Sequence, residues 1–244
     1  MRHEDGGFFS AEDADSLDPD EYAGITVDPS QSHEKKEGAY FLWRHNEVVN
    51  ILGEEASDIF NYHYGIKPKG NAHADPHGEF VGKNIVYAER TVNETAAHFK
   101  KDIEAIREVL GWAKQKLFKQ RGLRPRPSLD DKVLTDWNGL MISSLSFGAR
   151  VLNEPRYLQA AQRSAQFIQE NLITGNGRLL HRFRDGDAAI LGTIEDYAFF
   201  IHGLLELYEA NFQVKYLKQA ELLARDMVDL FWDEKQGGFY FTAD

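Results

Sequence analysis

The sequence predicts an all-α fold, an incomplete (α/α)6 toroid of helical hairpins with short β elements at the turns. Three observations predict it: a tandem unit, alternating buried and half-exposed helices, and a recurring glycine turn. Asp136, Trp137 and Gly177 are each followed 60 residues later by a matching residue: Asp196, Tyr197 and Gly237. Because the match extends over two helices and a turn, it indicates an internal repeat.

Each repeat unit has three elements. The first, such as "YAFFIHGLLELYEA" at 197–210, is apolar almost all round and predicts a buried inner helix. The second predicts an outer helix with one solvent face, because its apolar residues recur at helical spacing: Tyr216, Ala220, Leu223, Met227 and Leu230. The third, such as "GGFYF" at 237–241, predicts a glycine turn and a short β element.

The octet "GGFFSAED" at 6–13 nearly repeats "GGFYFTAD" at 237–244. We therefore expect it to close a unit whose helices lie outside this chain. Between the octets the sequence predicts a helix around 44–60, a long charged helix around 93–120, and loops at 17–36 and 67–83. Short β pieces are expected at "AYFLW" (39–43) and "NIVYA" (84–88).

The expected domain organisation is one partial toroid over residues 1–244, loop-rich over 1–90 and with regular hairpins over 130–244. Closed toroids of this kind use six hairpins, and roughly four are accounted for here. Further hairpins are therefore expected beyond the chain.

The composition argues against several classes of partner and of chemistry. The net charge is −11, with 39 acidic and 28 basic residues, which argues against nucleic acid or an anionic membrane as a partner. Cysteine is absent, which excludes disulfides, thiol redox chemistry and cysteine-ligated zinc. The N-terminal "MRHEDGGFF" lacks an apolar signal-like core, so a cytoplasmic location is favoured over secretion. The acidic composition is compatible with a neutral or cationic ligand.

Asp136 and Asp196 begin equivalent inner helices, whose axes are expected to lie roughly 8–10 Å apart. The two carboxylates are therefore expected at one rim of an axial cavity, each followed by an aromatic residue, Trp137 or Tyr197. Carboxylates bind sugar hydroxyls, aromatic rings pack on sugar C–H groups, and paired carboxylates act as acid and base in glycoside hydrolysis. Alternatively, both acids stabilise the starts of their own helices.

Two histidines are expected near the same cavity. His181 ("LLHRF") and His202 ("FFIHGLL") would serve as general bases near neutral pH, or as hydrogen-bonded core residues. His63, His73 and His77 lie in a Gly/Pro-rich stretch that offers no rigid frame for zinc, so they are interpreted as surface histidines.

Two polar stretches supply further candidate substrate contacts. In "RPRPSLDDKVLTDWNGL" (124–140), basic and acidic side chains are expected to meet at the cavity rim, or to form a salt-bridged entry loop; the candidates are Arg126, Lys132 and Asn138. In "SAEDAD" (10–15), Asp13 and Asp15 are candidate ligand-facing acids, or members of a solvated turn. The spacing lacks the pattern of an EF-hand, so no metal is expected, and no cofactor is implied.

Several strings together resemble a known family. "GGFFSAEDADS", "EGAYFLW", "HYGI", "RPRPSLDDKVLTDWNGLM", "EDYAFFIHGLLELYEA" and "LFWDEKQGGFYFT" run over the whole chain. In this the chain resembles spermatogenesis-associated protein 20 and its bacterial relatives, thioredoxin-domain proteins with a C-terminal toroid. The resemblance implies a six-hairpin-glycosidase-like toroid, similar to N-acylglucosamine 2-epimerases, whose histidines act as acid and base. It also implies that an N-terminal thioredoxin-like domain and the last hairpins lie outside this chain.

Three functional hypotheses follow. In the first, the chain is part of a carbohydrate-active protein, epimerase- or glycosidase-like, with acid/base chemistry at the axial cavity. The second is a non-catalytic carbohydrate-binding scaffold, and the third is an inactive fragment or an interaction module whose cavity holds no ligand. An enzyme needs two titrating groups within reach of one substrate, whereas a scaffold needs only aromatic rings and acids.

Overall fold

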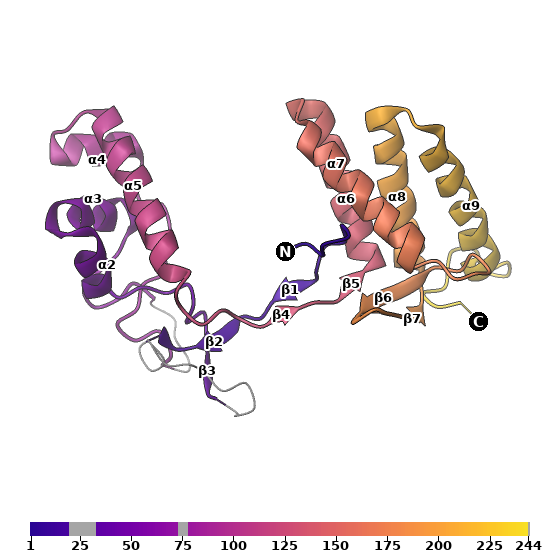
Figure 1. The fold of residues 1–244 in the computed structure, drawn as a ribbon, viewed down its shortest axis with the longest axis horizontal. Coiled ribbons are helices and arrows are strands. Elements are labelled where there is room, and N and C mark those ends of the chain that lie inside the picture. The colour runs from indigo at the N-terminus through magenta and orange to yellow at the C-terminus, as the bar shows by residue number, and fades with distance from the viewer. Residues whose placement is uncertain (20–32, 73–77, 244) are drawn as a thin grey trace. The chain divides into compact units, whose positions relative to one another are not determined.

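The computed structural model describes residues 1–19, 33–72 and 78–243 (Figure 1). Contacts divide the chain into two compact units, one formed by residues 1–11 and 129–244 and the other by residues 12–128. The short strands β1 (Ala11–Glu12) and β4 (Leu129–Asp130) lie where the chain passes from one unit to the other. Within the described ranges, eight helices dominate and the strands are short, so the predicted all-α fold of hairpins with β elements at the turns is confirmed. No helix in these ranges is long and apolar enough to span a membrane.

The first unit consists of two helical hairpins. Helix α6 (Thr135–Leu152) pairs with α7 (Pro155–Asn171), and α8 (Ile194–Asn211) pairs with α9 (Val214–Phe231). The inner helices α6 and α8 pack side by side, as Figure 1 shows. A three-stranded antiparallel sheet links the hairpins: β5 (Val133–Leu134), β6 (Leu180–Arg184) and β7 (Asp187–Leu191).

Two glycines set the separation of the inner helices. A Cβ atom on Gly139 would lie 2.5 Å from the backbone carbon of Phe199, and one on Gly203 would lie 2.6 Å from the backbone oxygen of Gly139. Real Cβ atoms do not approach that closely, so only glycine lets α6 and α8 touch backbone to backbone. This contact brings the first turns of α6 and α8 together.

The glycine turn recurs three times in this unit with one hydrogen-bond pattern. In each turn, a residue before the glycine accepts from the glycine N–H and donates its own N–H to the residue after the glycine; the sets are His3/Gly6/Gly7, Thr174/Gly177/Arg178 and Asp233/Gly237/Gly238. An isolated β-bridge spans each turn: Arg2↔Phe8, Ile173↔Leu179 and Trp232↔Phe239. The prediction that the two octets contain one repeated turn is confirmed.

The N-terminal segment is packed into the first unit. A Cβ atom on Gly7 would lie 2.9 Å from the Val133 side chain and 3.0 Å from Phe167, so the backbone there lies directly on the core. Asn138 accepts from the Phe8 N–H at 2.7 Å and donates to the Phe8 oxygen at 3.0 Å. A buried amide therefore fixes residues 1–11 on α6.

The second unit contains α2 (His45–Leu52), α3 (Glu54–Tyr64), α4 (Val92–Phe99) and α5 (Ile103–Arg121). The single helices expected at 44–60 and 93–120 are each two helices, which corrects that expectation. The first breaks at Gly53, with φ 81°, and the second ends at Lys100, with φ 52°. A residue with positive φ interrupts the helical backbone at each of these points, and Thr91 starts α4 through a reciprocal capping box with Glu94.

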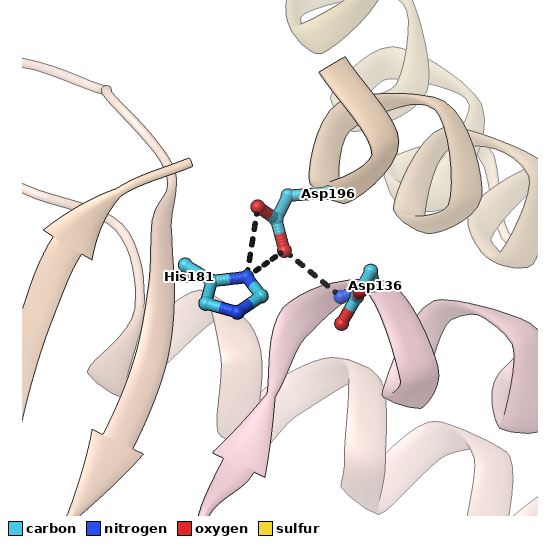
Figure 2. A group of neighbouring side chains, drawn as sticks. All are labelled: Asp136, His181 and Asp196. Atoms are coloured by element: carbon cyan, nitrogen blue, oxygen red, sulfur yellow. Dashed lines mark hydrogen bonds and ion pairs between the residues drawn. The ribbon is translucent and has the colours of Figure 1, made fainter. Parts of the chain in front are cut away.

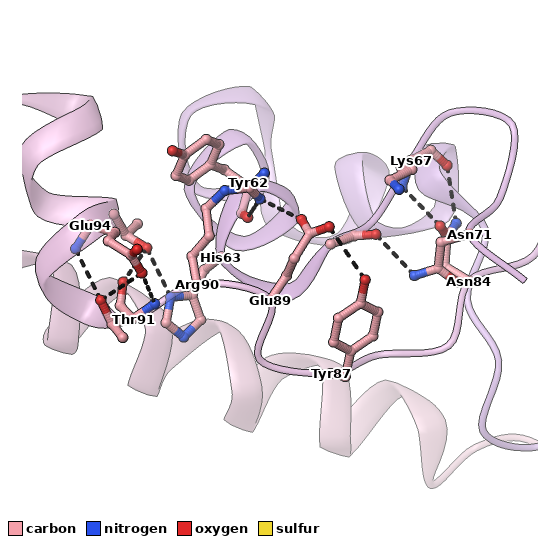
Figure 3. A network of polar contacts seen from close by, with 12 residues as sticks. Tyr62, His63, Lys67, Asn71, Asn84, Tyr87, Glu89, Arg90, Thr91 and Glu94 are labelled. Carbon is pink, nitrogen blue, oxygen red and sulfur yellow. Dashed lines mark hydrogen bonds and ion pairs between the residues drawn. The ribbon is translucent and has the colours of Figure 1, made fainter.

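The segments 39–43 and 84–88 do not form the expected β pieces. They are joined by one isolated bridge, Trp43↔Asn84, and strand pairing in this unit is instead between β2 (Asp15–Leu17) and β3 (Lys35–Glu37). Side-chain hydrogen bonds take the place of a strand ladder. Asn84 donates to the backbone oxygen of Lys67 (Figure 3) and to that of Trp43, and Asn71 donates to that of Ile85.

His63 is buried rather than exposed, which corrects its interpretation as a surface histidine. Its Nδ1 lies 2.9 Å from Thr95 Oγ1, which itself donates to the Thr91 oxygen at 2.9 Å. Because the hydroxyl proton is engaged there, Nδ1–H donates to the Thr95 oxygen. Burial first, and the charge of Lys114 second, lower the His63 pKa. His73 and His77 lie outside the described residues.

Candidate active site

Asp196 is the centre of the candidate site. It lies in the first turn of α8, and its side chain is fully buried. Its Oδ1 accepts from the Asp136 N–H at 3.1 Å, and its Oδ2 accepts from the Thr193 N–H at 2.8 Å and hydroxyl at 3.1 Å. One carboxylate therefore satisfies backbone donors at the starts of both inner helices, where such donors have no partner within their own helix.

The same carboxylate orients His181. His181 extends from β6, and its Nδ1 lies 2.9 Å from Oδ1 and 3.1 Å from Oδ2 of Asp196 (Figure 2). A carboxylate accepting at Nδ1 holds the proton on that nitrogen, which leaves a lone pair on Nε2. Among the described residues, Nε2 has no hydrogen-bond partner, and the side chain is 26% exposed. His181 is therefore arranged to accept a proton at Nε2.

Asp136 is the third member of the site. One carboxylate oxygen of Asp136, one of Asp196 and one ring nitrogen of His181 all lie within 4.8 Å of one another. Burial chiefly raises the Asp136 pKa; the Asp196 charge raises it further, against the lowering effects of a hydrogen bond from the Trp137 N–H and of His181.

A cation is a poor fit to these three groups despite their spacing. Both oxygens of Asp196 already accept hydrogen bonds from backbone and side-chain donors. A metal would have to replace those donors and leave the starts of α6 and α8 unsatisfied.

The two aromatic residues that follow the acids differ. Trp137 is 52% exposed on α6, where it remains a candidate platform for a ligand. Tyr197 is fully buried, packs on Phe231 with ring centroids 5.3 Å apart, and accepts from the Leu179 N–H through its hydroxyl. Tyr197 is therefore a core residue, which corrects its proposed role as a substrate contact.

Asn138 and Lys132 are also engaged elsewhere. Asn138 is 1% exposed, and its amide is used by Phe8, Leu134 and Ser164. It is a positioning residue for the N-terminal segment rather than a ligand contact. Lys132 pairs with Asp130 at 3.1 Å, as the salt-bridged entry-loop hypothesis expected.

The remaining candidates are not brought into this cluster. His202 lies on α8 with an exposed side chain, six residues beyond Asp196. Asp13, Asp15 and Arg126 belong to the second unit. Asp13 pairs with Lys35 at 3.3 Å, and its pKa is lowered by the Asp15 backbone N–H first and by Lys35 second.

Sequence reasoning missed three residues that build the site: Gly139, Gly203 and Thr193. The signals were present. An isolated glycine within an apolar helix often marks a close packing contact, and "TIED" at 193–196 has the spacing of a helix start. The repeat alignment did pair Asp136 with Asp196, and the two acids are neighbours.

The fold and the site define a protein of helical hairpins with an aspartate–histidine pair where the inner helices begin. The chain is 36% identical over 264 residues to human spermatogenesis-associated protein 20, an alignment that covers 100% of this chain and 32% of the human protein. It is 33% identical to the mouse protein of the same name, covering 98% and 32% respectively. An uncharacterized protein of Caenorhabditis elegans is 33% identical, covering 100% and 34%.

The chain is thus homologous along its own length to spermatogenesis-associated protein 20, and the predicted resemblance is confirmed. It spans about a third of the length of these curated relatives. No family model matches the sequence.

Two solved structures are also similar. A GH76 α-mannanase from Bacteroides thetaiotaomicron aligns with a TM-score of 0.43 and 18% identity, over 74% of this chain and 55% of that one. A sugar epimerase from a ruminal bacterium aligns with a TM-score of 0.45 and 14% identity, over 82% and 58%.

Proposed function

We propose that this chain carries the acid/base site of a carbohydrate-active α/α-toroid protein of the epimerase or isomerase type. The observation that carries the proposal is the buried Asp196 carboxylate, which binds His181 at Nδ1 and holds it beside Asp136. In this role, His181 Nε2 removes a proton from a sugar carbon next to a carbonyl group. Asp136, whose pKa burial raises, gives a proton to the carbonyl oxygen.

This arrangement favours isomerisation over glycoside hydrolysis. Hydrolysis by two carboxylates requires both to reach the glycosidic bond or its water. Asp196 is fully buried, and its oxygens are occupied by His181, Thr193 and the Asp136 N–H. Only Asp136 of the two acids has a carboxylate oxygen without a hydrogen-bond donor among the described residues, so the histidine supplies the second titrating group.

The proposed ligand is a small sugar with a free or latent carbonyl group. Trp137 follows Asp136 and exposes half of its surface, which provides an aromatic face for sugar C–H groups beside the acid. The family resemblance implies a thioredoxin-like domain in the longer relatives. No step of the chemistry proposed here depends on that domain.

The test is solvent exchange. The chain is incubated with aldoses, ketoses and N-acetylhexosamines in D2O, and deuterium incorporation at the carbon beside the carbonyl is followed by NMR. We expect exchange with at least one sugar, and a loss of about 100-fold or more in His181→Gln and in Asp136→Asn. His45→Gln, on α2 of the second unit, is the matched control and should exchange at the original rate.

Saturation-transfer NMR on the same samples separates the hypotheses. Sugar binding without exchange would support the carbohydrate-binding scaffold instead. If no sugar of the panel either binds or exchanges, the proposed carbohydrate site is contradicted.

A further inference from the structure

The second unit contains an apolar hollow of about 580 Å³ beside helix α5. That volume is within the range of small-molecule sites, roughly 300–1,000 Å³. Its apolar walls come from two loop segments and from helices α3 and α5, chiefly through Phe41, Trp43, Phe60, Ile85, Leu117 and Phe118.

Two asparagines fix one wall of the hollow. Asn84 is fully buried; its Nδ2 donates to the Trp43 oxygen at 3.2 Å, and its Oδ1 accepts from the Lys67 N–H at 2.8 Å. Asn71 exchanges two hydrogen bonds with the backbone of Ile85, both of 2.8 Å. The backbone at Trp43 and Ile85 is therefore set before any ligand arrives.

Arg124 fixes the segment before Trp43. Its Nη1 donates to the backbone oxygens of Tyr40 at 2.8 Å and Leu42 at 2.7 Å, and its Nη2 pairs with Glu47 at 2.8 Å. The guanidinium lies 4.0 Å from the centre of the Trp43 ring. Preformed walls lower the ordering cost of binding, so this hollow is built like a site rather than like a loose surface gap.

The charged side chains that line the hollow are both cationic. Lys114 and Arg121 line it with Gln115, and no acidic residue does. Neither cation pairs with a carboxylate among the residues that the structure describes.

Arg121 has an unused donor. Its guanidinium carbon lies 5.4 Å from the centre of the Phe41 ring and 5.5 Å from that of Phe118, and its Nε is buried with no acceptor in the described part of the chain. A buried donor without an acceptor costs free energy, and a carboxylate is the group that guanidinium nitrogens bind best.

We propose that this hollow binds an amphipathic carboxylate, with the apolar body among the aromatic walls and the carboxylate at Arg121, assisted by Lys114. The site lies within the second unit and is independent of the sugar site proposed above.

Dodecanoate is the probe, and dodecanol is the uncharged control ligand. Isothermal titration calorimetry on the whole chain should show saturable one-to-one binding of dodecanoate, at least tenfold tighter than that of dodecanol. Arg121→Met should weaken dodecanoate binding at least tenfold and leave dodecanol binding unchanged. Arg107→Met, on the exposed side of α5, is the matched control and should bind dodecanoate normally.

A second variant tests the hollow in a way that does not depend on whether Arg121→Met folds. Ile85 is 48% exposed at the rim, so Ile85→Trp should fill the hollow without disturbing the core and should abolish binding of both ligands. The proposal is overturned if dodecanoate does not bind saturably, or if Arg121→Met and Arg107→Met bind it equally well.

Discussion

The backbone oxygen of Gly139 lies 2.6 Å from the point at which a Cβ atom on Gly203 would stand. This contact between α6 and α8 is what allows Asp196 of one helix to accept a hydrogen bond from the first turn of the other. The site therefore depends on two residues that carry no functional group.

Gly203→Ala should lower the free energy of unfolding by about 1–3 kcal/mol, because the added methyl group overpacks a backbone contact. Urea denaturation followed by circular dichroism measures the change. Gly148→Ala, also on an inner helix, is the matched control: the nearest atom to its new Cβ is 3.5 Å away, an ordinary contact. There, alanine should raise stability by up to about 1 kcal/mol. Equal effects of the two substitutions would contradict the close helix contact.

Asp136→Asn should make the chain more stable than the original at pH 7. The folded-state pKa of Asp136 is raised above its ordinary value of 3.8, chiefly by burial. Its contribution to stability is therefore present below that value and is lost as the pH rises through the folded-state pKa. An asparagine oxygen still accepts from the Trp137 N–H but carries no charge.

Thermal melts between pH 3 and pH 7 test this prediction. The advantage of Asp136→Asn should shrink toward the acid end, where the original side chain is itself neutral. Asp229→Asn, at an exposed position of α9, shows the effect of removing one negative charge from so acidic a chain. A gain no larger than that of Asp229→Asn would count against a raised pKa at Asp136.

His63→Gln should reduce the loss of stability on mild acidification. Burial lowers the folded-state pKa of His63 below its ordinary value of 6.5, so the unfolded chain takes up the proton first. Stability is therefore full above pH 6.5 and is lost as the pH falls from there toward the folded-state pKa. Unfolding free energies at pH 7 and pH 5 should differ less in His63→Gln than in the original chain, and His45→Gln should leave that difference unchanged.

Asn138→Ala should destabilise the first unit by about 2 kcal/mol, because it removes the side chain that hydrogen-bonds both part-buried backbone groups of Phe8. Hydrogen exchange should show lost protection over residues 1–11. Asn176→Ala, in the exposed turn at 173–179, should change stability by no more than about 0.5 kcal/mol. Unchanged protection of residues 1–11 in Asn138→Ala would show that the segment is held by packing alone.

How far the sequence predicts this site is clearest at Asp196. The repeat predicted that it would neighbour Asp136, but treated a shared site and helix capping as alternatives. The structure combines them, because one carboxylate accepts from Thr193, from the Asp136 N–H and from His181. A period of 60 residues locates equivalent helix ends, whereas the number of donors around one oxygen depends on tertiary packing.

Tyr197 and Trp137 illustrate the same limit. They occupy equivalent repeat positions, yet one is fully buried and the other is 52% exposed. Burial at such a position depends on whether another hairpin covers it, and α9 covers Tyr197 through Phe231. The sequence analysis predicted neither the helix break at Gly53 nor the one at Lys100. A glycine can indicate a residue with positive φ, whereas a lysine does not.

The division of the first unit into residues 1–11 and 129–244 has a consequence for biosynthesis. The segment that contains Gly6 and Phe8 leaves the ribosome before residues 12–128, and its partners Asn138 and Phe167 leave after them. At 5–20 residues per second, that interval is roughly ten seconds. The intervening unit, with its own core, can complete its folding in that time. The N-terminal segment (residues 1–11) is therefore made well before the residues that hold it, and it can dock only after α6 and α7 have formed.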